Sequence, residues 1–316
     1  MYKVSIIIPV YNGEKYLIKC LNNVVEQTLR DIQIIVIDDG STDNSLNIIK
    51  KYSRKYPNIQ YQTKKNEGQA VARNIGIEMA EGEFITFIDS DDYVEKDMLE
   101  KMYNNAIENN ADIVVCDYVE ELANKRVYKK SLYMPEEDLQ KNYIISVAGP
   151  CSKIIRTKIF KENNLKFLEN NIYEDLAVIP ILAIYANKIT YCEEPLYHYV
   201  IRENSTMQQQ KYNKKIESIF NVMDELTSKF KGNGFEEELE FLYINHLLYA
   251  GIGRFIKYRN TEKQTERIRN IIKKKYPKWE NNKYYRQKGL VYKATCKIFY
   301  RNNKLLMEIY KKLRRG

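Results

Sequence analysis

The first 116 residues alternate between short apolar runs and stretches whose apolar positions lie three or four residues apart. The run Lys3–Pro9 is almost continuously apolar, as expected for a strand buried on both faces, and Glu14–Glu26 that follows has helical spacing. The alternation continues with the predicted strands Gln33–Asp38, Asn58–Gln62, Phe84–Asp89 and Asp112–Cys116, and with the predicted helices Ser41–Lys55, Gly68–Ala80 and Lys96–Asn109. This order predicts an α/β fold with a doubly wound, mostly parallel sheet.

The pattern changes after residue 116. Residues 117–150 mix polar and aromatic positions and suggest a hairpin with a short helix. Residues 151–205 predict a basic strand–helix segment, a helix from about Tyr173, and strands near 188–201, and from about Lys211 the spacing is helical. We therefore divide the chain into parts 1–116, 117–210 and 211–316, the last being a basic, mostly helical C-terminal region.

Composition narrows the class of protein. The 316 residues are 44% hydrophobic and 29% charged, which is typical of a globular protein. We expect no transmembrane helix, because no run of about 18 uncharged apolar residues exists, and no signal peptide, because the N-terminus leads straight into a strand. The five cysteines are scattered without a C-x-x-C pair, which indicates free thiols in a reducing cytoplasm.

The net charge of +9 is unevenly placed. Residues 254–316 carry 21 Lys/Arg against 4 Asp/Glu, whereas residues 1–253 carry 30 against 38. A basic tail of this kind indicates an anionic surface as its partner, either a membrane or a nucleic acid.

Polar side chains gather where the predicted strands end. Pro9–Gly13, Asp38–Asp43 and Asp89–Asp92 follow three of these strands, and Asn66–Ala70 precedes a helix at the same edge. In an open α/β sheet, ligands bind at the carboxyl ends of the strands. The cluster Asp89–Asp92 holds three carboxylates in four positions, which repel one another unless something positive lies among them.

Several familiar sites do not match these loops. The first strand is followed by PVYNG and not by G-x-G-x-x-G, and no P-loop motif is present. An EF-hand reading of Asp89–Glu100 fails because Val94 stands where that loop needs glycine. A phosphatase with an aspartate nucleophile fails because Ile37 stands at the nucleophile position.

Six blocks in register resemble family 2 glycosyltransferases that build bacterial surface polysaccharides. They are VSIIIPVYN (4–12), IDDGSTD (37–43), NEGQAVARNxG (66–76), FIDSDD (87–92), YEDLA (173–177) and PLYHYVIRENS (195–205). The resemblance covers roughly residues 3–210 and implies the GT-A fold. It also implies an inverting, metal-dependent enzyme that moves a sugar from a UDP-sugar to a glycan or lipid-linked acceptor.

The resemblance also suggests roles for individual residues. It implies Mn²⁺ or Mg²⁺ on Asp91, with Asp89 on the metal or the ribose, and Asp175 as the base that takes the acceptor proton. Asp39 would accept the uracil N–H, and His198 would be either a metal ligand or a packing or acceptor residue. The remaining residues expected around the nucleotide, diphosphate or acceptor are Pro9, Tyr11, Glu14, Arg73, Lys153, Arg202 and Ser205.

Simpler roles remain open for several of these residues. Glu14 could be a solvated residue of a first helical turn, and Arg73 and Lys153 could lie on the surface. Asp43 and Asp92 could cap helices, Asp92 also being a candidate for supporting the metal ligands, and the acids at 174–175 could complement a helix dipole.

The chain end NNKLLMEIYKKLRRG predicts a basic amphipathic helix, with Leu305, Leu306, Ile309, Tyr310 and Leu313 on one face. We expect it to hold a cytoplasmic enzyme on the inner face of the plasma membrane; packing on the body or on a second subunit is the alternative. Rival functions are a nucleotide-sugar hydrolase, a nucleotidyltransferase, and a non-catalytic polysaccharide-assembly or nucleic-acid-binding protein. We expect no nucleic-acid partner, because the basic residues lie apart from the acidic loops.

Overall fold

The structure is a computed structural model that describes residues 1–133, 137–146, 148–201 and 212–313. For residues 311–313 it describes the backbone alone. It divides into two compact units, Met1–Gln208 and Gln209–Gly316, which are described separately below.

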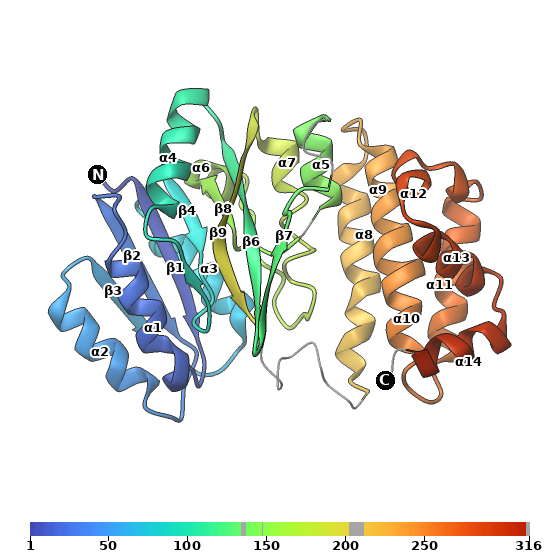
Figure 1. Cartoon of the computed structure of the whole chain (residues 1–316), viewed down its shortest axis with the longest axis horizontal. Helices are drawn as coiled ribbons and strands as arrows, with labels where there is room; N and C mark the ends of the chain where they lie inside the picture. Colours follow the sequence, from blue (N-terminus) through green and yellow to red (C-terminus); the bar gives the residue numbers. More distant parts are fainter. Residues whose placement is uncertain (134–136, 147, 202–211, 314–316) are drawn as a thin grey trace. The chain divides into compact units, whose positions relative to one another are not determined.

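A mixed sheet forms the centre of the first unit (Figure 1). Within the described residues it has nine strands, ordered β3-β2-β1-β4-β8-β6-β9-β5, with β7 beside β6. The pairs among β3, β2, β1 and β4 are parallel, as is β6 with β9, while β8 runs antiparallel between β4 and β6. The strands are β1 (Val4–Val10), β2 (Ile32–Asp38), β3 (Ile59–Thr63), β4 (Phe84–Phe87), β5 (Tyr93–Val94), β6 (Ile113–Leu122), β7 (Lys125–Lys129), β8 (Lys153–Arg156) and β9 (Ile189–Val200).

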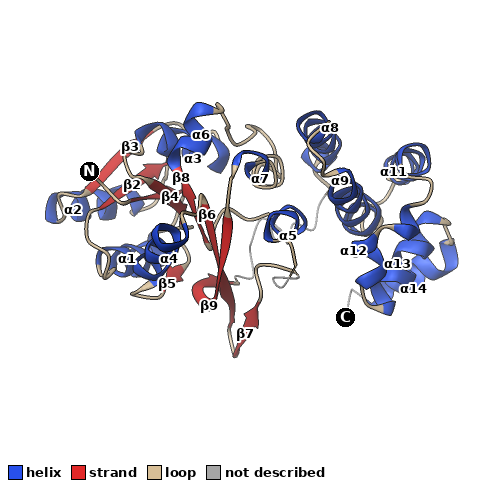
Figure 2. Ribbon diagram, turned by 90° about the horizontal axis from the view of Figure 1, so that it is seen from above, coloured by secondary structure: helices blue, strands red, loops and turns tan. Residues whose placement is uncertain are grey.

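Helices cover both faces of this sheet (Figure 2). Helices α1 and α4 lie on one face, and α3 and α6 lie on the other. The helices of this unit are α1 (Glu14–Val25), α2 (Ser45–Lys55), α3 (Gln69–Met79), α4 (Met98–Asn109), α5 (Leu139–Ile145), α6 (Thr157–Glu162) and α7 (Leu182–Tyr185). The predicted α/β architecture is therefore confirmed.

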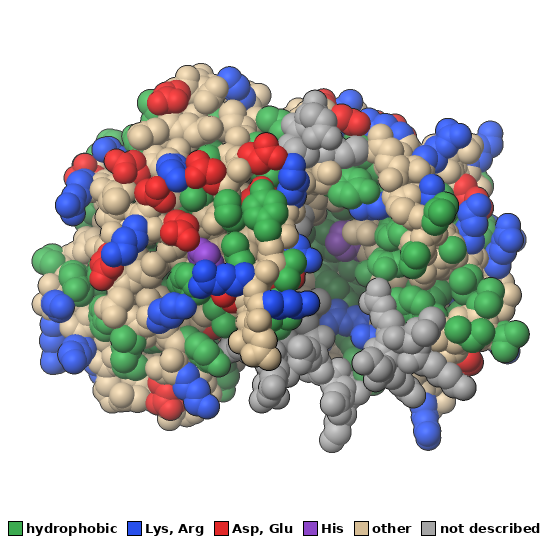
Figure 3. All heavy atoms as spheres, in the orientation of Figure 1, with side chains coloured by type: hydrophobic (Ala, Val, Ile, Leu, Met, Phe, Trp, Pro, Cys, Tyr) green, Lys and Arg blue, Asp and Glu red, His purple; other side chains and the backbone are tan. Residues whose placement is uncertain are grey.

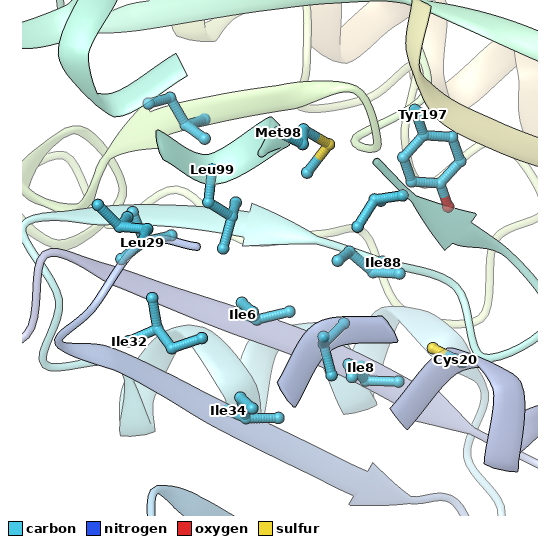
Figure 4. Packing of buried hydrophobic residues seen from close by; sticks show 14 of the residues in the cluster. Ile6, Ile8, Cys20, Leu29, Ile32, Ile34, Ile88, Met98, Leu99 and Tyr197 are labelled. Atoms are coloured by element: carbon cyan, nitrogen blue, oxygen red, sulfur yellow. The ribbon is translucent and has the colours of Figure 1, made fainter. Parts of the chain in front are cut away.

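The apolar runs of the sequence become the core between sheet and helices. Ile6 and Ile8 of β1 face α1 and α4 and pack with Cys20, Met98 and Leu99, all fully buried (Figure 4). The intervening Ile7 lies under α3 on the opposite face, where a Cβ on Gly76 would be only 2.3 Å from the Ile7 side chain. Alternate residues of β1 thus face opposite layers, which explains why the strand is apolar throughout.

Two local predictions are wrong. Residues 174–180 form turns and not a helix, because Pro180 disfavours helix at the residue before it and follows the β-branched pair Val178–Ile179. Asp92 is not a helix cap, because β5 intervenes and α4 begins only at Met98, with Asp97 before it. The strands expected near 188–201 are one strand, β9, which pairs with β6 across a bulge.

The second unit is helical where it is described. It contains α8 (Ser218–Phe230), α9 (Glu236–Leu242), a π-helical segment (Tyr243–Gly251), α10 (Ile252–Phe255), α11 (Glu262–Lys275), α12 (Lys283–Gln287), α13 (Leu290–Tyr300) and α14 (Lys304–Leu313). Its core includes Trp279, which packs against Tyr285. No helix of the described chain is long and apolar enough to cross a bilayer. All five cysteines are free thiols, as predicted.

Candidate active site

The loops after β1 and β2 are tied together at the carboxyl edge of the sheet. Asn12 N–H donates to Ser41 Oγ at 3.0 Å, and Gly13 N–H donates to Ser45 Oγ at 2.9 Å. Asn12 adopts a positive φ of 49°, which asparagine tolerates better than most residues. The two loops therefore form one surface beside the end of β1, where Pro9 is buried and Tyr11 is 51% exposed.

Glu14 and Asp43 link the start of α1 to the start of α2 by hydrogen bonds. Glu14 N–H donates to Asp43 Oδ2 at 3.0 Å, and Asn44 N–H donates to Glu14 Oε2 at 2.9 Å. Asp43 also accepts from the N–H of Ser45, the first residue of α2, but it precedes the N-cap residue Asn44 and is therefore not the helix cap considered for it. These contacts give Glu14 a structural partner; its contact with nucleotide stays a prediction.

The side chains of Asp38 and Asp39 accept hydrogen bonds from different groups. Asp38 accepts from Thr63 Oγ1 at 2.7 Å and from Ser41 N–H at 3.2 Å, so it orders its own loop. Asp39, only 3% exposed, accepts from the N–H groups of Glu67 and Gly68 and from the ammonium of Lys64. A carboxylate has about four acceptor positions, which leaves Asp39 about one for a base N–H.

Gly40 allows these two loops to meet. It has a φ of +74°, and a Cβ there would lie 2.9 Å from the backbone nitrogen of Asn66. A side chain at this position would therefore strain the backbone and push the 64–68 loop away from Asp39.

Arg73 supplies the positive charge that the acidic cluster requires. It lies on α3, is 3% exposed, and donates to Asp89 Oδ1 at 3.0 Å and to Glu174 Oε1 at 2.9 Å. Glu174 also accepts from the Gln69 side chain. One guanidinium thus joins the loop after β4 to the loop that contains Asp175, and the surface location considered for Arg73 is wrong.

Asp92 links the same loop to β9. Its carboxylate accepts from Tyr197 Oη at 2.6 Å and from Val200 N–H at 2.8 Å, both on β9. Tyr197 Oη in turn accepts from Asp89 N–H at 3.3 Å. Burial, together with the charges of Asp89 and Asp91, raises the pKa of Asp92 well above its ordinary value. Asp92 therefore supports the loop and does not point to solvent.

Asp89 and Asp91 fit the donor set of a hard divalent cation. Asp89 has one oxygen on Arg73 and a side chain 31% exposed, and Asp91 is half-buried. Mg²⁺ and Mn²⁺ commonly take one or two carboxylates and complete their shell with phosphate and water. Among the residues that the structure describes, no group of three or more His, Cys, Asp or Glu side chains is arranged to hold a metal.

His198 has partners on both ring nitrogens and on its ring face. Its Nε2 lies 2.8 Å from Glu95 Oε1, and its Nδ1 lies 3.0 Å from Glu121 Oε1. The ring stacks on Tyr93 with centroids 4.3 Å apart. Both ring nitrogens therefore face carboxylates, which favours the packing alternative, and metal ligation by His198 stays a prediction.

Asp175 combines partial exposure with a perturbed pKa. Burial raises its pKa to about 6, the charge of Glu174 adds to the rise, and Leu176 N–H and Arg73 oppose it. Leu176 N–H donates to Asp175 Oδ1 at 2.7 Å. A carboxylate with this pKa is ionised at neutral pH and still a better proton acceptor than an ordinary aspartate.

Lys153 lies inside the protein and not on its surface. It is 1% exposed, and its ammonium donates to the carbonyl oxygens of Gly149 at 2.7 Å and Cys151 at 3.4 Å. Burial lowers its pKa to about 8, although the thiols of Cys151 and Cys116 and the charge of Asp175 act in the opposite direction. Lys153 therefore fixes the 149–151 loop, and its expected contact with the acceptor stays a prediction.

Arg202 and Ser205 lie outside the described residues. Conversely, Lys64 and Tyr197 contribute to the site although no role was predicted for them, and Glu174, considered only as a helix-dipole acid, is a partner of Arg73. Lys64 follows β3 by one residue, so it belongs to the same edge of the sheet as the loops after β1, β2 and β4. The position of a strand end could have identified Lys64, whereas the Tyr197–Asp92 pair spans 105 residues and leaves no local pattern.

Known proteins resemble this chain along most of its length. Residues 5–163 match the model of the family described as glycosyl transferase family 2. The chain is 30% identical to putative glycosyltransferase EpsH of Bacillus subtilis, covering 85% of this chain and 81% of that protein. It is 33% identical to poly(ribitol-phosphate) beta-glucosyltransferase of Bacillus spizizenii, where it spans only 38% of that protein's length.

Solved structures agree with the sequence matches. A crystal structure of residues 1–349 of Staphylococcus aureus TarS with UDP-GlcNAc superposes with a TM-score of 0.73 at 26% identity, covering 86% of this chain and 81% of that chain. A complex of the same TarS fragment with UDP gives 0.74 at 24% identity. The expected GT-A fold is confirmed.

Proposed function

The chain belongs to glycosyl transferase family 2, and we propose that it moves a sugar from a UDP-sugar to a glycan or lipid-linked acceptor in bacterial surface polysaccharide synthesis. Its membership makes it a sugar-transferring enzyme and sets aside the nucleotidyltransferase and non-catalytic alternatives. One observation carries the proposal for this site: the Arg73 bridge, which holds Asp89 of the acidic loop and Glu174, the neighbour of Asp175, on one guanidinium.

We assign the donor to the loops after β1, β2 and β4. Tyr11 offers an exposed ring for the base, and Asp39 retains an acceptor position for the imide N–H of uracil. UDP as the carrier is supported by the TarS complexes with UDP-GlcNAc and UDP. Asp91, with Asp89 beside it, would hold Mn²⁺ or Mg²⁺. That ion would neutralise the diphosphate as it leaves.

Asp175 is assigned the role of general base. The acceptor hydroxyl oxygen attacks the anomeric carbon while its proton passes to an Asp175 oxygen, and the bond to the diphosphate oxygen breaks with its electron pair staying on UDP. A single displacement of this kind inverts the anomeric centre. Arg73 is assigned the role of a positioning residue, because it holds Asp89 on one side and Glu174 on the other.

The proposed acceptor is based on the names of similar proteins. TarS and the Bacillus spizizenii protein are named for transfer to poly(ribitol-phosphate), and EpsH is a putative glycosyltransferase. We propose an acceptor of the same general kind, a growing surface polymer or its lipid-linked precursor. It would be met on the cytoplasmic side, with the enzyme peripheral on the inner face of the plasma membrane.

A UDP-release screen tests the proposal. The purified chain would be incubated with a panel of UDP-sugars, including UDP-GlcNAc, with Mn²⁺ or Mg²⁺ and then with EDTA. We expect slow release of UDP from at least one member of the panel, lost with EDTA and restored by excess metal. Release from a GDP-sugar but from no UDP-sugar would overturn the choice of nucleotide. Full release in EDTA would overturn the metal.

A further inference from the structure

Helix α14 has two apolar edges, and only one of them is used inside the second unit. Met307 is 8% exposed, and Tyr310 packs edge-on against Phe299 of α13 with centroids 5.0 Å apart. The Tyr310 hydroxyl would lie 3.4 Å from a Cβ on Gly253. These contacts fix which side of α14 faces the protein.

The opposite edge faces solvent. Leu305 is 73% exposed, Ile309 46% and Leu306 38%, and the first turn of α13 adds Leu290 and Val291, each 81% exposed. Hydrophobic side chains gather over the α13–α14 region on the face shown in Figure 3. Single exposed aliphatic residues are common, but three on the solvent side of α14, with two more on the helix that packs against it, indicate an interaction surface.

The same hairpin is strongly cationic. Residues 288–316 carry nine Lys/Arg and one acid, Glu308. Lys297 pairs with Glu280 of the neighbouring segment at 2.7 Å, but the exposed Arg301 and Lys304, which join α13 to α14, meet no carboxylate in the described part of the chain. The exposed aliphatic residues are therefore flanked by positive charge that the protein itself does not neutralise.

We propose that this α13–α14 surface, Leu290, Val291, Leu305, Leu306 and Ile309 with Arg301 and Lys304, docks the enzyme on an anionic lipid bilayer. Aliphatic side chains enter the boundary between headgroups and acyl chains, while lysine and arginine remain at the anionic headgroups. The inference deepens the proposed function, because it gives the surface that would hold the enzyme beside a lipid-linked acceptor.

The composition of this surface argues against a second copy of the chain and against a nucleic acid as its partner. A second copy placed symmetrically on this surface would bring the same cations face to face, which costs free energy. A nucleic acid would use the cations, but its phosphate backbone offers nothing to the exposed leucine and isoleucine side chains. An anionic bilayer can contact both the exposed aliphatic side chains and the cations of this surface.

Vesicle co-sedimentation of the full chain tests the inference. The probes are vesicles of phosphatidylglycerol with phosphatidylcholine, and vesicles of phosphatidylcholine alone. We expect the wild type to bind the anionic vesicles, and the double variant Leu305→Ser/Ile309→Ser to need at least about tenfold more lipid for half-binding. The matched control is Ile107→Ser on α4, because Ile107 is 47% exposed, almost the same as Ile309.

Three outcomes would overturn the inference: equal binding to neutral vesicles, equal loss in the Ile107 control, or a dimer in light scattering that the double variant abolishes. UDP release is measured on the same samples without vesicles and should be unchanged by the double variant. Vesicle binding without UDP release would contradict the proposed function alone, and UDP release without vesicle binding would contradict the docking surface alone.

Discussion

The two units of the chain use their charged side chains in opposite ways. In the α/β unit, charges are buried in pairs: Arg73 with Asp89 and Glu174, and Lys64 with Asp39. In the helical unit, the α13–α14 hairpin holds exposed Arg301 and Lys304 without acidic partners among the described residues. Buried pairs fix geometry because breaking them leaves an uncompensated charge, whereas exposed cations contribute little to folding and remain available for a partner.

The comparison predicts that chemistry and membrane docking can be lost separately. The largest effect is expected from Asp175→Asn, which keeps the shape of the side chain and removes the proton acceptor. We expect sugar transfer to fall by about 10²–10⁴-fold, because that is the usual contribution of a general base. Calorimetry should show UDP binding within about threefold of wild type, and vesicle binding should be unchanged. The control is Asp224→Asn, an exposed residue of α8. Near-normal turnover in the Asp175 variant would remove it from the mechanism.

Breaking the buried pairs should cost stability as well as activity. Arg73→Met leaves Glu174, 3% exposed, and Asp89 without their guanidinium, and we expect about 3 kcal/mol of lost stability in thermal or urea unfolding. Arg73→Lys keeps the charge but cannot span both carboxylates, so we expect a smaller loss of stability with a clear drop in kcat.

The matched control for the Arg73 variants is Arg54→Met. Arg54 is exposed on α2, and we expect a change within about 0.5 kcal/mol. Equal effects of the two methionine variants would mean that burial of the charge pair does not matter.

The raised pKa of Asp175 has a consequence for stability. The folded state binds this proton more tightly than the unfolded chain, so the contribution is full below about pH 4 and is lost as the pH rises through about 6. Asp175→Asn should therefore unfold at a higher temperature than wild type at pH 7, by the equivalent of about 1–3 kcal/mol, and the gain should vanish near pH 4. A variant that is less stable than wild type at pH 7 would contradict the burial of this charge.

The smallest expected effect concerns His198. His198→Gln removes the ring that stacks on Tyr93 and faces Glu95 and Glu121, so we expect a loss of about 1–2 kcal/mol of stability. The Mn²⁺ concentration for half-maximal activity should change by less than about twofold. A rise of about tenfold or more would instead support His198 as a metal ligand.

The sequence was most informative where the structure is local. Buried strands such as Lys3–Pro9 are visible as apolar runs, and the carboxyl ends of parallel strands necessarily share one edge, so the donor loops could be placed without coordinates. The contact of Asp43 with the Ser45 N–H at the start of α2 is local in the sequence. The role of Asp92 is not, because its partners Tyr197 and Val200 come from a strand more than 100 residues away.

Contacts between residues far apart in the sequence also determine the roles of the charged residues. Helical spacing placed Arg73 one turn into α3, but only the folded chain shows that it meets Asp89 and Glu174 together. For His198, the sequence left metal ligation, packing and acceptor contact open, and the contacts with Glu95 and Glu121 come from other parts of the chain. For α14, the pattern placed Leu305, Ile309 and Tyr310 on one face. The structure instead turns Tyr310 inward together with Met307 and leaves Leu305 and Ile309 exposed.

The pH dependence of kcat/KM for sugar transfer tests the central claim most directly. If Asp175 is the base, kcat/KM should be level above about pH 7 and fall about tenfold per pH unit below the pKa of about 6. UDP binding measured over the same range should stay nearly constant, which separates the base from the donor loops. A profile that stays flat down to about pH 5 would contradict the assignment of Asp175 as the base.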